Sequence, residues 1–274
     1  MKLAEKLKQL QGQGKSLLAV NFYNFETLKG ILVAASQLNH AVILQMTRGS
    51  IEYMGLEVAV SMAKSCIRSY GVEAWLHLDH GDNIDLVKKC LDAGFDSVMI
   101  DASEEEISKN IDITSSVVEM SRSYSANVEA ELGYVAKLGQ DSDRTGFTKP
   151  EDAKMFVDQT GINALAVAIG TAHGFYKAPP FLQIELLKEI RKVVDIPLVL
   201  HGSSGVPDDQ IREAIKNGIC KINLATEVKN TFMNTLKSSI NKSDNIDLRK
   251  VFPEATEAVS KLITSKLFIA GVLR

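Results

Sequence analysis

Three of the five histidines lie where a short apolar run gives way to polar residues. These three are His80, His173 and His201, and the others are His40 and His77. Neutral imidazoles that converge from distant points of a chain are typical ligands of a catalytic zinc ion, which keeps one position open. His77 and His80 stand at odd and even positions of one run, so only one should face inward, and we assign that place to His80. His40, at a helix end, and His77 are interpreted as structural.

The elements that must position these histidines repeat in a regular order. Eight short runs are mostly apolar throughout, which is typical of parallel strands covered on both faces. They are LLAVNF (17–22), AVILQM (41–46), AWLHL (74–78), SVMID (97–101), NVEAE (127–131), ALAVAIG (164–170), PLVLHG (197–202) and KINLAT (221–226). Helical patterns fill the gaps, and no linker interrupts the chain. We therefore predict a single-domain (β/α)₈ TIM barrel over residues 1–274.

An open doubly wound sheet is the alternative for such alternation. The count of eight strands favours the barrel, and no G-x-G-x-x-G follows the first run, which disfavours dinucleotide binding.

The strand ends of the predicted barrel are rich in polar and ionisable residues. In TIM barrels the chemistry collects at the carboxyl ends of the strands. The residues at these ends are Asn21, Thr47, Asp79, His80, Asp101, Glu131, His173, His201, Asn223 and Thr226. We expect them to meet at one rim, with Asp101 and Glu131 as further metal ligands or as hydrogen-bond partners of the histidines.

Two loops have the composition of a phosphate site. The segments after the seventh and eighth strands read HGSSG (201–205) and NLAT (223–226), and these loops form the common phosphate site of such barrels. Glycines let the backbone approach an anion, and hydroxyls and backbone N–H groups can bind it. The expected contacts are Gly174, Gly202, Ser203, Ser204, Asn223, Leu224, Ala225 and Thr226.

Charge, apolar pattern and cysteine count limit the kinds of partner and cellular compartment that we expect for this chain. The formal net charge is -3 and no basic stripe is interleaved with aromatics, so we expect no nucleic-acid partner. Leu3, Leu7 and Leu10 recur at helical spacing, which predicts a helix across a barrel end; neither a signal peptide nor a membrane partner is expected. The three cysteines, an odd number without a CxxC pair, predict free thiols and a cytoplasmic protein.

Together these residues resemble the class II, zinc-dependent ketose-bisphosphate aldolases, nearest to the tagatose-bisphosphate branch. The match is collinear from about residue 17 to the C-terminus. Its motifs are LHLDHG (76–81), SVMIDAS (97–103), VEAELG (128–133), AVAIGTAHGFY (166–176), PLVLHGSSG (197–205) and GICKINLATE (218–227). The resemblance implies cleavage of tagatose or fructose 1,6-bisphosphate to dihydroxyacetone phosphate and glyceraldehyde 3-phosphate.

The resemblance also implies roles for single residues. It makes His80, His173 and His201 the zinc ligands and Asp79 the general acid/base, while Asp101 and Glu131 match positions of a second or alternate metal site. The residues that it assigns to substrate are Gly174, Gly202, Ser203, Ser204, Asn223, Leu224, Ala225 and Thr226 for dihydroxyacetone phosphate, with Asn21 and Thr47 near the distal phosphate. A monovalent cation, Na⁺ or K⁺, is implied near the phosphate. Arg249 matches an arginine that reaches a neighbouring subunit's site, which implies a homodimer or homotetramer.

One loop departs from the family pattern. The segment 133–150 is long, polar and placed like a lid. The family's loop carries a glutamate that moves the proton on the dihydroxyacetone carbon, whereas the segment here is two residues longer and has no glutamate. Asp141 is the nearest substitute, with Asp143 behind it.

Three alternatives stay open. A class I aldolase needs a lysine in the rim; Lys221 lies in the eighth strand, but the sixth has none, and the histidines would then have no role. A zinc hydrolase on this scaffold typically begins with H-x-H in the first strand, which here reads LLAVNF. A non-catalytic barrel that serves as a regulatory partner subunit is the third.

Overall fold

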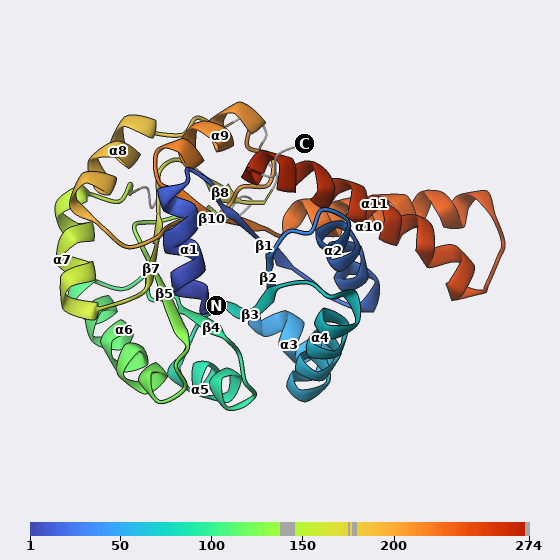
Figure 1. Cartoon of the computed structure of the whole chain (residues 1–274), viewed down its shortest axis with the longest axis horizontal. Helices are drawn as coiled ribbons and strands as arrows, with labels where there is room; N and C mark the ends of the chain where they lie inside the picture. The colour runs from blue at the N-terminus through green and yellow to red at the C-terminus, as the bar shows by residue number, and fades with distance from the viewer. Residues whose placement is uncertain (138–145, 175, 177–179, 272–274) are drawn as a thin grey trace.

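Eight parallel strands close into a barrel in the computed structural model, which describes residues 1–137, 146–174, 176 and 180–271. Around the barrel their order is β1, β10, β9, β7, β5, β4, β3 and β2 (Figure 1). Their bounds are β1 Leu17–Asn21, β2 Val42–Met46, β3 Ala74–Gly81, β4 Ser97–Ile100, β5 Asn127–Leu132, β7 Ala164–Val167, β9 Leu198–Leu200 and β10 Ile219–Leu224. The predicted (β/α)₈ TIM barrel is thereby confirmed.

Helices surround the barrel on its outside (Figure 1). The ring consists of α2 Phe25–Gln37, α4 Leu56–Tyr70, α5 Ile84–Asp92, α6 Ile107–Arg122, α7 Pro150–Thr160, α8 Ile184–Val193, α9 Asp208–Lys216 and α11 Leu248–Ala270. The short helix α3 (Arg48–Met54) follows β2, and α10 (Thr226–Lys242) pairs with α11. The far part of this α10–α11 hairpin extends away from the barrel.

Strand alternation divides the apolar side chains between two cores. Leu18 and Val20 of β1 belong to the large cluster between the strands and the outer helices. Leu17 and Ala19 point the other way and pack with Leu7 of α1 (Leu3–Gly12), which lies across one end of the barrel. Burial of Leu3, Leu7 and Leu10 confirms the helix predicted for this end.

The strand bounds differ from the sequence prediction at one place that matters for the site. The sixth run was expected to lead directly into His173, but β7 already ends at Val167. His173 lies instead in the two-residue strand β8 (Ala172–His173), which pairs in parallel with β6 (Ala136–Lys137). A separate small sheet outside the barrel therefore holds this histidine over the rim.

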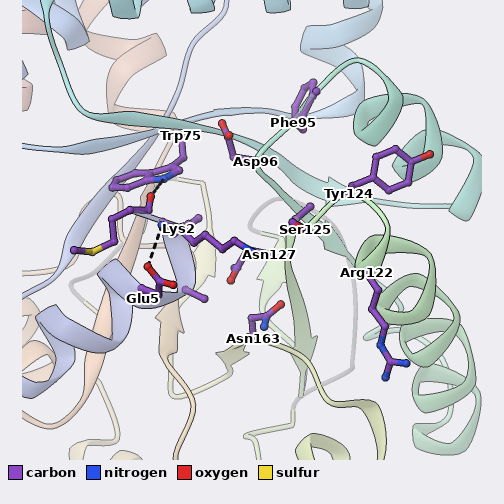
Figure 2. Close-up of a pocket in the computed structure, with 15 residues that line it drawn as sticks. Lys2, Glu5, Trp75, Phe95, Asp96, Arg122, Tyr124, Ser125, Asn127 and Asn163 are labelled. Carbon is purple, nitrogen blue, oxygen red and sulfur yellow. Dashed lines mark hydrogen bonds between the residues drawn. The ribbon is translucent and has the colours of Figure 1, made fainter.

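A further cavity lies at the opposite, N-terminal end of the barrel. Its volume is about 880 Å³, and Figure 2 shows Trp75, Asn127 and Asn163 in its wall near the start of α1. None of the predicted rim residues lines it. This end of a barrel typically serves stability, whereas the carboxyl ends carry the chemistry. Among the described residues, no helix has the length and apolar character needed to cross a membrane.

Candidate metal centre and active site

The end of β3 delivers three polar side chains to the barrel interior. Period-two alternation turns His77 and Asp79 inward, and both are almost fully buried. His80 then adopts a left-handed backbone with φ 50°, which interrupts the alternation and turns this side chain inward as well. The prediction that only one of the two histidines faces inward was therefore wrong, because it assumed an unbroken strand geometry up to His80.

Three imidazoles meet at the rim as the sequence predicted. The ring centroid of His80 lies 4.8 Å from that of His173 and 4.7 Å from that of His201, and the last two are 6.0 Å apart. Glu131 from the end of β5 joins them, so that one possible ligand atom from each of the four residues lies within 4.8 Å of every other. Asp101 is not part of this cluster.

Neighbouring carboxylates orient two of the three rings. The Nδ1 of His80 lies 2.7 Å from Asp101, which also accepts hydrogen bonds from Ser103. The Nε2 of His201 lies 2.9 Å from Glu129. Each ring therefore turns its other nitrogen toward the cluster, Nε2 for His80 and Nδ1 for His201. Asp101 acts on the cluster through His80, as a carboxylate bound to the far nitrogen of a metal ligand does.

Two buried atoms of the cluster lack hydrogen bonds although they nearly touch. His201 Nδ1 and Glu131 Oε2 form an ion pair at 2.9 Å, and within the described residues neither atom makes a hydrogen bond of good geometry. Burying such atoms without hydrogen bonds is costly. A cation bound by both would satisfy them, and imidazole nitrogens with one carboxylate oxygen are a common zinc donor set. The residues present thus fit a metal ion.

The charges around the cluster perturb its histidines. Burial acts to lower the pKa of His201, but the hydrogen bond to Glu129 and the charges of Glu129 and Glu131 raise it to about 10 in the metal-free protein. His173 shows the opposite shift, since burial and the positive charges of His80 and His201 lower its pKa to about 3. Binding of a metal ion at the cluster therefore requires a proton to leave His201.

Asp79 is held beside the cluster by two amides. Asn21 donates to one carboxylate oxygen at 2.8 Å and Asn223 to the other at 3.1 Å, and His80 Nε2 lies 3.9 Å from Asp79. Burial acts to raise the pKa of Asp79, but the positive charges of His80 and His201 outweigh burial and lower the pKa. Asp79 is therefore an ionised carboxylate that can accept a proton.

The two residues expected near a distal phosphate have different surroundings. Asn21 is fully buried between Asp79 and Gln45, whose side chain donates to it at 2.7 Å. Its place in the structure is that of a partner of Asp79. Thr47 precedes α3, and its hydroxyl lies 3.3 Å from that of Ser50. Contact of either residue with phosphate stays a prediction.

The two predicted phosphate loops lie side by side and are tied together. The Ser203 hydroxyl donates to the Asn223 carbonyl, and the Ser204 hydroxyl accepts from the backbone N–H of Glu227 at 3.3 Å. Gly202 has φ 64°, and a Cβ there would lie 2.5 Å from the Ala172 carbonyl oxygen, so only glycine fits.

A helix N-terminus completes this corner of the rim. Leu224 ends β10, Ala225 caps α10, and Thr226 is its first residue. Helix N-termini favour anions because their N–H groups and macrodipole point toward them. Gly174, with φ 113°, follows directly on His173. The corner can thus receive a phosphate next to the metal cluster.

Arg249, which was also predicted to belong to the site, lies away from the histidine cluster. Arg249 is at the start of α11 on the extended hairpin, exposed and paired with Asp247 at 2.9 Å. Contact of Arg249 with a neighbouring subunit stays a prediction. Asp141, predicted to replace the missing glutamate, and Asp143 behind it lie outside the described residues.

The cluster borders an acidic cavity. A space of about 590 Å³ beside His80 and His173 is otherwise lined by Asp82, Asp101, Ala102, Glu104 and Glu105. Arg48, at the edge of this region, is paired with Asp82 at 2.5 Å and with Glu52 at 2.9 Å.

A layer of buried polar residues below the rim was missed by sequence reasoning. It consists of Gln45, His77, Ser97, Glu129 and Lys221, all between 0% and 1% exposed. The signal was present in the sequence: His77, Glu129 and Lys221 each precede a predicted rim residue by two positions. Strand alternation would have placed them on the same inward face.

Tyr176 was also missed. Its hydroxyl accepts from the Ala172 N–H at 2.5 Å and donates to the Gly202 carbonyl at 2.8 Å. This residue therefore joins the strand that holds His173 to the predicted phosphate loop.

Comparison with known proteins gives a uniform result. Residues 1–272 match the family described as class II fructose-bisphosphate aldolase. The YdjI aldolase of Escherichia coli K12 is 30% identical with a TM-score of 0.88, over 98% of this chain and 96% of that one. A putative fructose-1,6-bisphosphate aldolase of Coccidioides immitis is 27% identical with a TM-score of 0.90, over 99% and 96%. The fructose-bisphosphate aldolase of Campylobacter jejuni, at 24% identity and a TM-score of 0.83 over 99% and 94%, shares the fold.

Proposed function

Since this chain belongs to the class II fructose-bisphosphate aldolase family and is an aldolase, we propose that it cleaves a ketose 1,6-bisphosphate with the help of a bound zinc ion. The products are dihydroxyacetone phosphate and glyceraldehyde 3-phosphate, and the sugar is fructose or tagatose 1,6-bisphosphate. The observation that carries the proposal is the convergence of three histidines and Glu131, with His201 Nδ1 and Glu131 Oε2 only 2.9 Å apart at its centre.

The metal is assigned to His80, His173 and His201, with Glu131 as a further donor. When bound there, zinc supplies a Lewis acid that stabilises negative charge on the ketose oxygens as the carbon–carbon bond breaks. The chain's own contribution begins with orientation: Asp101 and Glu129 fix two of the imidazoles before any substrate arrives.

Asp79 is the general base of the cleavage. Its ionised carboxylate lies next to the cluster and takes the proton from the C4 hydroxyl as the C3–C4 bond breaks. The amides of Asn21 and Asn223 hold both of its oxygens in place. The carbonyl oxygen of the Asn223 side chain is buried without a partner, and we assign it to a substrate hydroxyl.

The phosphate of the dihydroxyacetone half binds at the corner of the rim formed by residues 202–205 and the start of α10. Backbone N–H groups and hydroxyls fix it there, which orients the reacting carbon toward Asp79 and the cluster. A monovalent cation, Na⁺ or K⁺, is assigned to the same corner.

We also propose that the enzyme works in the cytoplasm as a homodimer or homotetramer. The support for assembly is the α10–α11 hairpin, which carries exposed apolar residues and Arg249. These apolar residues are Met233, Ile240, Ile246 and Leu248. A second subunit would cover them and receive Arg249 at its substrate site.

A second candidate substrate is a ketose 1-phosphate with an uncharged far end. Four carboxylates line the cavity beside His80 and His173, and a second phosphate placed there would meet like charge. No non-catalytic role is favoured, because the acid/base and the predicted metal ligands are all in place.

A substrate panel separates the candidates. Initial cleavage rates are measured for fructose and tagatose 1,6-bisphosphates and for the corresponding 1-phosphates, with zinc present. The proposal expects the highest kcat/KM for one of the bisphosphates. Faster cleavage of a 1-phosphate would favour the second candidate, and turnover of none would contradict the proposed function.

A further inference from the structure

A buried lysine lies directly below the predicted metal cluster, where a cation is unexpected. Lys221 comes from β10, its side chain is fully buried, and its ammonium lies 2.8 and 3.0 Å from the two oxygens of Glu129. Burying two charges is costly unless they pair with each other and with further polar groups. The neighbours of this pair should therefore supply further polar contacts that stabilise the two buried charges.

The neighbours of the pair form one continuous chain of contacts. On one side, Glu129 Oε1 lies 2.9 Å from His201 Nε2. On the other, His77 Nε2 lies 3.4 Å from the Lys221 ammonium, while His77 Nδ1 lies 2.8 Å from the Ser97 hydroxyl. Burial and the charge of Lys221 lower the pKa of His77 to about 3, so this imidazole is neutral and its Nε2 can accept from the lysine.

Glu129 thus has both oxygens occupied by cationic or N–H donors. One oxygen faces His201 and Lys221, and the other faces Lys221 alone at hydrogen-bond distance. Once His201 has lost a proton to become a neutral ligand, the acceptor at Nε2 fixes the tautomer that leaves Nδ1 unprotonated, and Nδ1 is the atom that faces Glu131. The Lys221 ammonium can only donate hydrogen bonds. The atoms of residue 129 that face it must therefore be acceptors.

We propose that Lys221 and Glu129 are a positioning pair that holds His201 in the ring orientation and tautomer required for metal binding, with Lys221 acting through Glu129. The inference rests on the proposed metal site. It also gives Lys221 a role other than the Schiff base of a class I aldolase, since its nitrogen is enclosed by Glu129 and His77 rather than open to the rim.

The test uses a substitution and its rescue. In Glu129→Gln, the new amide N–H₂ must face either the Lys221 ammonium or the His201 N–H, so two donors oppose each other. In the double variant Glu129→Gln with Lys221→Met, the ammonium is gone. The amide oxygen can accept from His201 while the N–H₂ turns toward His77, whose Nε2 lies 3.9 Å from Glu129 Oε2 in the parent.

Zinc affinity is measured by competition with a chelator, and the visible spectrum of the cobalt-substituted protein reports the ligand geometry. Loss of an outer partner typically weakens metal affinity by about 10–100-fold. We expect Glu129→Gln to lose affinity in this range and to change the cobalt spectrum, and the double variant to return to within about threefold of the parent. Cys220→Ala, a change at the neighbouring buried position of β10, serves as the matched control and leaves both readouts unchanged.

The outcomes are distinct. If residues 129 and 221 only fill space, the double variant is at least as impaired as the single one, and the inference is overturned. Parent-like affinity of Glu129→Gln also overturns it. If Glu129→Gln fails to fold, the double variant must still fold and bind zinc, and its failure counts against the pair. A parent protein that binds no zinc would contradict the proposed function itself, independently of the variants.

Discussion

His201 Nδ1 and Glu131 Oε2 lie 2.9 Å apart in the mouth of the barrel without forming a hydrogen bond. His201 directly follows β9 and Glu131 lies in β5, strands far apart in the sequence, and both residues are buried. The Nε2 atom of His201 is held by Glu129 at 2.9 Å. In the metal-free protein the raised pKa of His201 keeps a proton on this ring, and a cation bound between the two atoms would take the place of that proton.

Removal of one ligand should eliminate the metal and the activity together. We predict that His201→Ala loses stoichiometric zinc and lowers kcat by about 10³-fold or more, because the Lewis acid is lost. Zinc content is measured by atomic absorption alongside the cleavage rate. The matched control is His40→Ala, since His40 lies outside the cluster beside the Ala41 carbonyl. Full activity with normal zinc in His201→Ala would refute the assignment.

Asp79 should affect the chemistry more than the metal. We expect Asp79→Asn to keep its zinc and to lower kcat by about 10²–10⁴-fold, the usual contribution of a general base. Asp92 is exposed on α5 and paired with Lys88 away from the acidic cavity, so Asp92→Asn is the control and should retain near-parent kcat. Equal losses in the two variants would mean that Asp79 is not the base.

The metal-free protein should lose stability as the pH rises. The folded pKa of His201 is raised to about 10, above the ordinary value of about 6.5, so its stabilising contribution is fully present below pH 6.5. That contribution disappears as the pH approaches 10. One pKa unit corresponds to about 1.4 kcal/mol, so we expect a decrease of several kcal/mol between pH 7 and 10.

Urea unfolding of chelated protein at several pH values measures this decrease. His201→Gln removes the titrating group and serves as the reference for all other groups that ionise in the same window. The expected result is a much flatter profile for the variant than for the parent. Parallel profiles would show that the pKa of His201 is not raised.

Glycine at position 202 should be essential for the phosphate corner. We predict that Gly202→Ala raises KM for the phosphorylated substrate and costs about 1–3 kcal/mol of stability, because the new Cβ meets the Ala172 carbonyl in a left-handed backbone. Gly49→Ala is the control on the same rim, since a Cβ there meets nothing within 4 Å. Substrate titrations and thermal unfolding of both variants give the comparison.

Arg249 offers a test of assembly. We expect Arg249→Ala to fold normally, because the side chain is exposed and its partner is the nearby Asp247, yet to lose kcat/KM. Mixing it with inactive His201→Ala should restore activity after subunit exchange, since a mixed oligomer contains one site with both residues. No restoration, or parent-like kcat/KM of Arg249→Ala alone, would contradict a shared site.

The strand pattern made the barrel predictable, because eight mostly apolar runs alternate with helical patterns. The meeting of the three histidines at the rim was predicted from their places at or after the ends of the apolar runs. Two features of the site could not be predicted from the sequence pattern. The left-handed backbone at His80 coincides with an irregularity in the pairing of β3 with β4 between Leu78 and Gly81, which is a tertiary feature. The separate strand β8 depends on pairing with β6 and not on local propensity.

The buried layer around Lys221 was missed for a different reason. The last residue of each predicted strand identifies the rim. The inward-facing residues of the layer below it lie two positions earlier and were not considered. Glu129 stood inside a recognised motif, yet its pairing with Lys221 joins residues 92 positions apart, and no local pattern shows such a contact.

The most direct test of the account is a coupled aldolase assay on fructose and tagatose 1,6-bisphosphates with native, chelated and zinc-restored protein. The account predicts cleavage of at least one sugar, loss of that activity after chelation, and recovery when zinc is added back. Cleavage that survives complete removal of metal would contradict the central claim, since the three histidines and Glu131 would then have no part in the reaction.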